Sequence, residues 1–246
     1  MSVSGGVCSF GDPLYVNEFF EEEINAAVRV AEDFGTYLMV HCHNSSGAQR
    51  AFRAGAKTFE HMSCVDEETV KMLAEGGCMG TVQVLTPMSI ATTYPKGDPR
   101  QVKGQFAVDS TSKVFEYAKK YNFPLAWGTD LLDSLENRDK QLDDLTMRTQ
   151  FGFTPMELMI QATGNGGKMV ALSGKRNPYG KLGVIEEGAM ADILIYNENP
   201  CEDINVVGKH EETLKLVIKD GDIVTNQYPT KFIGKKYCTA CPEGKK

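Results

Sequence analysis

Apolar and polar residues along the first part of the chain follow two periods in turn. Between residues 17 and 34 apolar side chains recur every three or four positions, which predicts an amphipathic helix with acidic residues in its first turns. The apolar run 37–40 predicts a short buried strand. A helix over 45–54, closed by Gly55, and a strand over 57–60 are predicted next.

The same alternation continues to about residue 130. The pattern predicts a helix over 66–75, a strand over 78–85, a helix over 110–121 and a strand over 123–128. Residues 86–108 hold prolines and glycines without sustained periodicity, so we expect a long loop there. Strands that alternate with helices of ten or more residues indicate an α/β fold with a parallel sheet, either doubly wound or a barrel.

From Thr154 the pattern changes. Residues 154–172 predict two helices separated by the small-residue step TGNGG. Residues 181–200 and 213–226 are rich in β-branched side chains and contain glycine turns, with a tight hairpin expected at 219–222. A small β appendage is therefore expected after the α/β body.

Three residues with metal-binding side chains stand at the ends of predicted strands. His41, His61 and Asp130 each follow one, and the carboxyl ends of parallel strands meet at one edge, where ligands bind. For any single histidine, an ordinary core or rim position is the simpler explanation. The occurrence of three such residues at the ends of predicted strands favours a common site. His43, two residues beyond His41, is expected either to contact substrate or to be a solvated loop residue.

Composition narrows the classes of partner. The chain has 246 residues, 41% of them hydrophobic, and a formal net charge of −7. This acidic balance argues against binding to nucleic acid or to an anionic membrane surface, so a small-molecule substrate is expected. The N-terminus lacks the charged and apolar regions of a signal peptide, and a cytoplasmic location is the default expectation.

Seven cysteines are scattered through a chain too long to need a disulfide scaffold, which favours reduced thiols. Cys238 and Cys241 form a CxxC pair near the C-terminus. One such pair is half of a zinc site, so the alternatives are metal binding and a frayed tail.

Three motifs together resemble the amidohydrolase superfamily, in particular its imidazolonepropionase-like and Xaa-Pro dipeptidase-like branch. They are HCHNSSGAQRAFRAGAKTFEH from His41 to His61, WGTD ending at Asp130, and GKLGVIEEGAMADILIYNENP from Gly180. The resemblance implies a (β/α)8 TIM-type barrel with a flanking β-sandwich, and a site with one or two divalent ions, zinc being the first choice.

By this resemblance His41 and His61 are metal ligands at the ends of barrel strands five and six. Asp130 matches the acid at the end of strand eight, which ligates metal and, as the catalytic residue, accepts a proton from water and later protonates the leaving amine. His43 is assigned to substrate binding. The implied reaction is hydrolysis of a C–N bond in an amide, a cyclic amide or a dipeptide.

Two elements of the family pattern are absent from the sequence: the HxH pair of the first strand and the lysine that ends the fourth. We therefore interpret residues 1–180 as the C-terminal half of the barrel (strands five to eight), 181–227 as a segment of the β-sandwich, and 228–246 as a tail. Self-association into a homo-oligomer, a complementing N-terminal fragment, or a longer gene would supply the rest. The competing hypothesis is a catalytically inactive half-barrel that folds by self-association.

Overall fold

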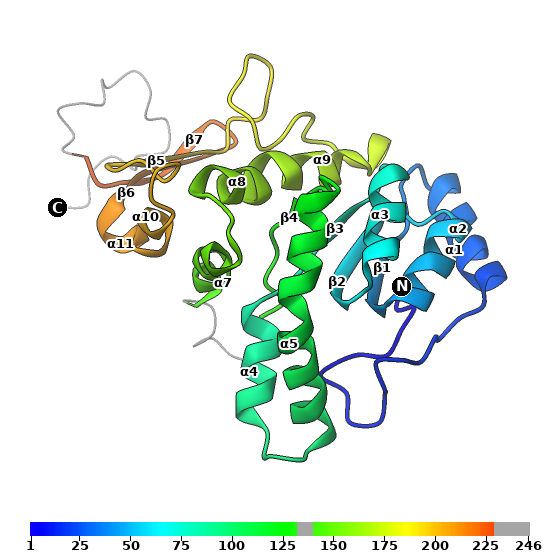
Figure 1. Cartoon of the computed structure of the whole chain (residues 1–246). Helices are drawn as coiled ribbons and strands as arrows, with labels where there is room; N and C mark the ends of the chain where they lie inside the picture. Colours follow the sequence, from blue (N-terminus) through cyan, green and yellow to red (C-terminus); the bar gives the residue numbers. More distant parts are fainter. Residues whose placement is uncertain (132–139, 229–246) are drawn as a thin grey trace, which may run out of the picture.

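The computed structural model describes residues 1–131 and 140–228, and these build two separate sheets (Figure 1). The larger sheet is parallel, with its strands in chain order. Its strands are β1 (Met39–Asn44), β2 (Thr58–Cys64), β3 (Met79–Thr81) and β4 (Leu125–Ala126). The predicted α/β fold with a parallel sheet is confirmed.

Helices cover one side of this sheet and bury the core against it (Figure 1). They are α1 (Glu21–Asp33), α2 (Ser45–Ala54) between β1 and β2, and α3 (Glu67–Glu75) between β2 and β3. Ile24, Val40, Ala51, Phe59 and Val70 are fully buried at this interface. The apolar positions that predict the helices and strands are thus those that pack together, as burial of apolar area requires.

The first residues of the chain extend the sheet beyond β1. Ser2 forms a parallel bridge with His41. The His41 amide donates to the Met1 carbonyl at 2.9 Å, and the Val3 amide donates to the His41 carbonyl at 3.0 Å. Residues 1–4 therefore occupy the place of a further parallel strand on the outer side of β1.

The prediction of a long loop over residues 86–108 is wrong. Most of this segment belongs to α4 (Leu85–Thr93) and α5 (Pro99–Lys120), which lie side by side as a hairpin that extends away from the sheet (Figure 1). A Cβ atom on Gly104 would lie 2.8 Å from the Ala91 amide nitrogen, so glycine at this position permits the close approach of the two helices. The helix predicted over 110–121 is the second half of α5.

A chain of short helices follows β4 and the undescribed residues. It consists of α7 (Gln141–Met147), η1 (Arg148–Phe151), α8 (Pro155–Ile160), η2 (Gln161–Asn165), α9 (Gly166–Ala171) and η3 (Gly174–Arg176). Thr154 caps α8 in a capping box with Glu157, as the sequence predicts. The TGNGG step lies in and after the π-helical turn η2, which joins α8 to α9 without leaving the helix.

A buried ion pair ties these helices to the sheet. Asp144 and Arg148 are both fully buried and approach to 3.2 Å. Asp144 also accepts from the amides of Val84 and Leu85, at the start of α4, and Arg148 donates to the Val82 carbonyl at 2.5 Å. The pair therefore fixes the segment that leads from β3 into α4.

The small sheet is antiparallel and lies at the opposite end of the molecule from α1 (Figure 1). It holds β5 (Ile193–Tyr196), β6 (Leu214–Lys219) and β7 (Asp222–Asn226), with α10 (Asn205–Gly208) and α11 (His210–Thr213) between β5 and β6. The hairpin predicted at 219–222 is confirmed by the pairing of Lys219 with Asp222. None of the described helices has the length and apolarity needed to cross a membrane. The CxxC pair lies outside the described residues.

Candidate metal centre

Three imidazoles from the neighbouring strands β1 and β2 lie close together. The predicted strand 37–40 extends through Asn44 in the structure, so His41 and His43 both lie on β1. Because successive side chains of a strand point to opposite faces, residues two apart share a face. His61 comes from β2, with which β1 pairs in parallel.

The three rings touch one another. The centroids of His41 and His43 are 4.8 Å apart, those of His41 and His61 are 4.5 Å apart, and those of His43 and His61 are 4.9 Å apart. One nitrogen from each ring can be chosen so that all three lie within 4.8 Å of one another. Two nitrogens on a tetrahedral zinc ion are about 3.4 Å apart, so side-chain shifts of about 1 Å would close this set around one ion.

Burial favours the neutral form of these imidazoles. Burial lowers the pKa of His41, and the neighbouring His61 lowers it further. The pKa of His43 is lowered well below its ordinary value, first by burial and then by the other two rings. Burial also lowers the pKa of His61, although Asp130 and Gln83 act in the opposite sense. Neutral imidazoles have the free lone pair that a metal ligand needs.

One nitrogen of this cluster lacks the partner that its burial calls for. His43 is 4% exposed, and its Nδ1 has no hydrogen-bond partner among the residues that the structure describes. A buried polar atom without a partner costs free energy that a ligand could offset. The donor set, three imidazoles, suits zinc or another borderline divalent metal. The residues present therefore fit the metal expected from the sequence.

Asp130 stands at the edge of the cluster. Its Oδ2 is 4.0 Å from Nδ1 of His61, and its side chain is 39% exposed. The residue has a left-handed backbone, with φ of 54°, and the preceding carbonyl of Thr129 accepts from the Thr86 hydroxyl at 2.6 Å. Its carboxylate therefore lies beyond the end of β4, two strands away from β2, close to His61 but outside the three-ring set.

A cavity of about 390 Å³ opens onto the rings. Its lining includes the loop that contains Gly6, Cys8 and Asp12, and residues of α4. This volume falls in the range of small-molecule sites, and the mixture of apolar walls with a few convergent polar groups is typical of them.

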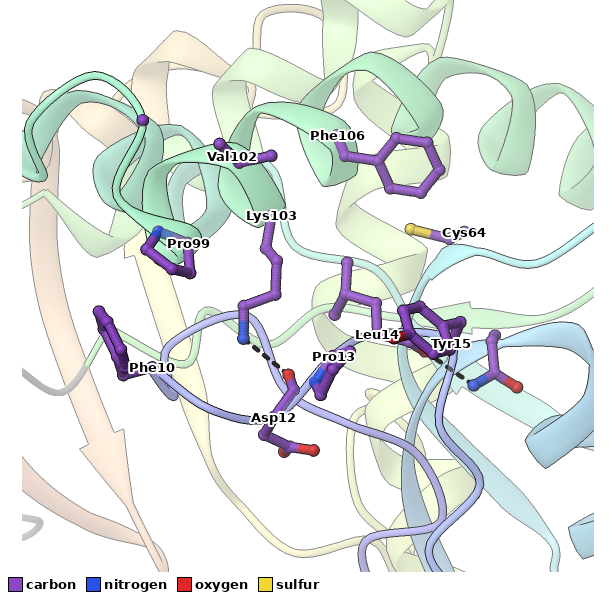
Figure 2. A pocket seen from close by; sticks show the side chains of 12 residues that line it. Phe10, Asp12, Pro13, Leu14, Tyr15, Cys64, Pro99, Val102, Lys103 and Phe106 are labelled. Atoms are coloured by element: carbon purple, nitrogen blue, oxygen red, sulfur yellow. Dashed lines mark hydrogen bonds between the residues drawn. The ribbon is translucent and has the colours of Figure 1, made fainter.

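A second cavity lies behind the same loop. It measures about 720 Å³ and is lined mainly by apolar side chains of the loop and of α5, including Phe10, Tyr15 and Phe106 (Figure 2). Figure 2 shows Lys103 reaching from α5 to the loop, where its ammonium donates to the carbonyls of Gly6, Ser9 and Asp12 at 2.5, 2.6 and 2.7 Å. The loop residues around Asp12 thus form a wall between the two cavities.

The structure brings together His41 and His61, and it places Oδ2 of Asp130 4.0 Å from Nδ1 of His61. It also places His43 inside the cluster, so the alternative of a solvated loop residue is wrong. The sequence signal for this was the HxH spacing, which puts both rings on one face if the strand continues. Gln83, which bonds His61 Nδ1 at 2.9 Å, was missed because the sequence places it inside the predicted strand 78–85, where β3 in fact ends at Thr81.

Simple alternation along β2 would turn Glu60 to the face opposite His61. In the structure it is paired in register with His41, and its carboxylate accepts from the Thr81 hydroxyl at 2.7 Å. Alternation fails because His61 and Met62 have positive φ angles of 73° and 52°, which distort the strand.

Comparison with known proteins gives a consistent match. The model of the amidohydrolase family matches residues 13–224. An ochratoxinase from Aspergillus niger is 30% identical over 213 residues, which cover 82% of this chain and 41% of that protein. An imidazolonepropionase from Shewanella pealeana is 26% identical over 208 residues, covering 82% of this chain and 44% of that protein.

Solved structures of similar proteins superpose on this chain. A prolidase complexed with N-methylphosphonate-L-proline superposes with a TM-score of 0.80 at 28% identity, covering 92% of this chain and 54% of that one. The A. niger ochratoxinase gives a TM-score of 0.78 at 28% identity, with 92% and 50% coverage. A Xaa-Pro dipeptidase with bound methionine in the active site gives 0.77 at 27% identity, with 92% and 53% coverage.

The chain spans less than half the length of these two curated relatives. The family match nevertheless extends over most of the sequence, and it includes the strands that carry the three histidines. On this evidence, the chain belongs to the amidohydrolase family.

Proposed function

We propose that this chain is half of a metal-dependent hydrolase that cleaves C–N bonds, with a divalent metal held by His41, His43 and His61. The observation that carries the proposal is the packing of three neutral imidazoles at the carboxyl ends of two parallel strands, with ligand nitrogens within 4.8 Å of one another. Zinc is the first candidate because imidazole nitrogens are among its common ligands.

The division of the chain follows the sequence interpretation. Strands β1 to β4 are proposed as barrel strands five to eight within residues 1–180, and β5 to β7 as part of a sandwich within 181–227. The parallel bridge of Ser2 to His41 supports an additional strand before β1. The coverage of half or less of each curated relative supports a barrel completed by residues from a longer sequence, a complementing chain or a second copy.

His43 changes its proposed role. The sequence suggested a contact to substrate, but the buried position of its ring and the unpartnered Nδ1 support a third imidazole ligand. Asp130 keeps its proposed role as catalytic acid and base. Its carboxylate is partly exposed and faces the cluster, so it can take a proton from water and return it to a leaving amine.

When bound, a divalent metal in such a site supplies a nucleophilic water at neutral pH and polarises a carbonyl oxygen. The chain's own residues orient the reaction. The loop around Asp12 and the start of α4 enclose the cavity of about 390 Å³, which suits a dipeptide, an N-acyl amino acid or a cyclic amide. The names of the relatives, a prolidase, an ochratoxinase and an imidazolonepropionase, support this range of substrates.

The test is a hydrolysis assay. The protein assayed is the product of the whole reading frame that contains this sequence, which is the chain by itself if the frame contains nothing more. The protein is loaded with zinc and offered Xaa-Pro dipeptides, N-acyl amino acids and cyclic amides. We expect release of the free amine or acid, and a loss of at least about 100-fold in Asp130→Asn and His61→Ala. A folded protein that binds no metal, or a zinc-loaded protein that cleaves none of these substrates, would contradict the proposal.

A further inference from the structure

Four side chains form a continuous line of hydrogen bonds that ends at His61. Nδ1 of His61 is 2.9 Å from Oε1 of Gln83. Nε2 of Gln83 donates to the Thr81 hydroxyl at 3.2 Å, and that hydroxyl donates to Oε2 of Glu60 at 2.7 Å. The His61 amide also points to the Thr81 hydroxyl, at 3.5 Å.

The carboxylate of Glu60, at the far end of this line from His61, determines which group donates and which accepts in every bond. A carboxylate can only accept, so the single proton of the Thr81 hydroxyl goes to Glu60. The hydroxyl can then only accept from Gln83, which turns the amide nitrogen of Gln83 toward Thr81 and its oxygen toward His61.

His61 has one way to satisfy that oxygen. Its Nδ1 must carry the proton and donate to Gln83, which leaves the lone pair of the neutral ring on Nε2. The opposite tautomer would place two lone pairs against each other. Because Thr81 and Gln83 are 6% and 5% exposed, water has little access to reverse the order of these bonds.

Asp130 provides a weaker pull in the same sense. Its Oδ2 is 4.0 Å from Nδ1 of His61, beyond the length of a hydrogen bond, whereas Gln83 is at 2.9 Å. The amide is therefore the direct partner of this nitrogen.

We infer that Glu60 is a positioning residue that selects the tautomer of His61 through Thr81 and Gln83, and that this relay presents Nε2 of His61 to the divalent metal. The inference rests on the proposed function, because it assigns a purpose to a ligand of that site. Groups that bond the outer nitrogen of a ligating histidine fix its tautomer and ring orientation, and their loss typically lowers metal affinity about 10- to 100-fold.

The test reads the tautomer directly in the metal-free protein by ¹⁵N NMR of the imidazole nitrogens. The wild type is expected to show a protonated Nδ1 and an unprotonated Nε2 on His61. Thr81→Val removes the hydroxyl with little change of shape, so Gln83 can flip and both tautomers should appear. Thr81→Ser keeps the hydroxyl and should restore the wild-type spectrum.

Glu60→Gln is the second variant. A carboxamide can donate to Thr81 as well as accept from it, so the order of the bonds is no longer fixed and a mixture of tautomers is expected. Zinc affinity should fall about 10- to 100-fold in Thr81→Val and recover in Thr81→Ser. Asp130→Asn should leave the tautomer of His61 unchanged.

Retention of the single Nδ1-protonated form in both Thr81→Val and Glu60→Gln would overturn the inference, as would unchanged zinc affinity in folded Thr81→Val. The NMR measurement needs no metal, so it decides the relay by itself. A wild type that bound no zinc would instead overturn the proposed function.

Discussion

The imidazole of His43 lies almost parallel to that of His61, with 19° between the ring planes and 4.9 Å between the centroids. Two charged imidazoles would repel each other at this distance, and burial in addition lowers the pKa of both rings. The arrangement is stable with neutral rings, and it leaves lone pairs that a proton or a metal ion can take. Removal or addition of either should therefore be measurable.

His43→Ala should reduce the zinc content of the protein as strongly as His61→Ala does, because the structure places both rings in one set. The measurement is metal analysis after dialysis against limiting zinc. His210→Ala removes the fourth histidine of the sequence, which belongs to α11, and is the matched control. A zinc content in His43→Ala equal to that of the control would show that His43 is not a ligand.

The metal-free protein should lose stability as the pH falls from 7 to 5.5. Burial lowers the pKa of His41, His43 and His61 in the folded state, so below about pH 6.5 the unfolded chain binds more protons than the folded one. The free energy of unfolding should fall by at most about 1.4 kcal/mol per pH unit for each histidine. Urea titrations in EDTA measure it, and His43→Leu should flatten the slope. Stability that increased over this range would have the wrong sign.

Arg148→Met should destabilise the fold by about 3–5 kcal/mol, because it leaves the fully buried carboxylate of Asp144 without its cation. Lys71→Met, which breaks the exposed pair with Glu75 at 3.9 Å, should change stability by less than about 1 kcal/mol. Urea unfolding of both variants makes the comparison. Equal small effects would mean that the Asp144–Arg148 pair is not needed to hold α4 and the sheet together.

Lys103→Met should loosen the loop between the two cavities. The ammonium holds three loop carbonyls, and these would be left to water. We expect faster amide hydrogen exchange in residues 5–12, by about 10-fold or more, with little change in β1 and β2. Lys113→Met, on an exposed turn of the same helix, is the control. Identical exchange in the two variants would exclude Lys103 as the support of this wall.

Much of the parallel sheet could be predicted from the sequence, because its signals are local. The apolar runs before His41 and His61 mark strands, and the run 45–54 with Gly55 gives the bounds of α2 without error. The residues at which strands end are harder to predict. The strand that carries His41 runs four residues further than its apolar run, because polar side chains there face a cavity instead of the core.

The helical structure of α4 and of the first half of α5 was missed for two different reasons. The start of α4 has no cap in its own sequence, since Asp144, about 60 residues later, accepts from its first amides. No local pattern reveals such a partner. For α5 the signal was present, because Asp98 caps the helix and Pro99 occupies its first turn. The positive φ angles of His61 and Met62, which interrupt the alternation of side chains on β2, likewise have no marker in the local pattern.

In the proposed centre, one divalent ion binds to the imidazoles of His41, His43 and His61. X-ray absorption at the zinc edge, on protein reconstituted with one zinc per chain, tests it most directly. We expect at least three imidazole nitrogens at about 2.0–2.1 Å, and one fewer in His43→Ala. A spectrum with fewer than three imidazole ligands in the wild type, or one that is unchanged in His43→Ala, would contradict this ligand set.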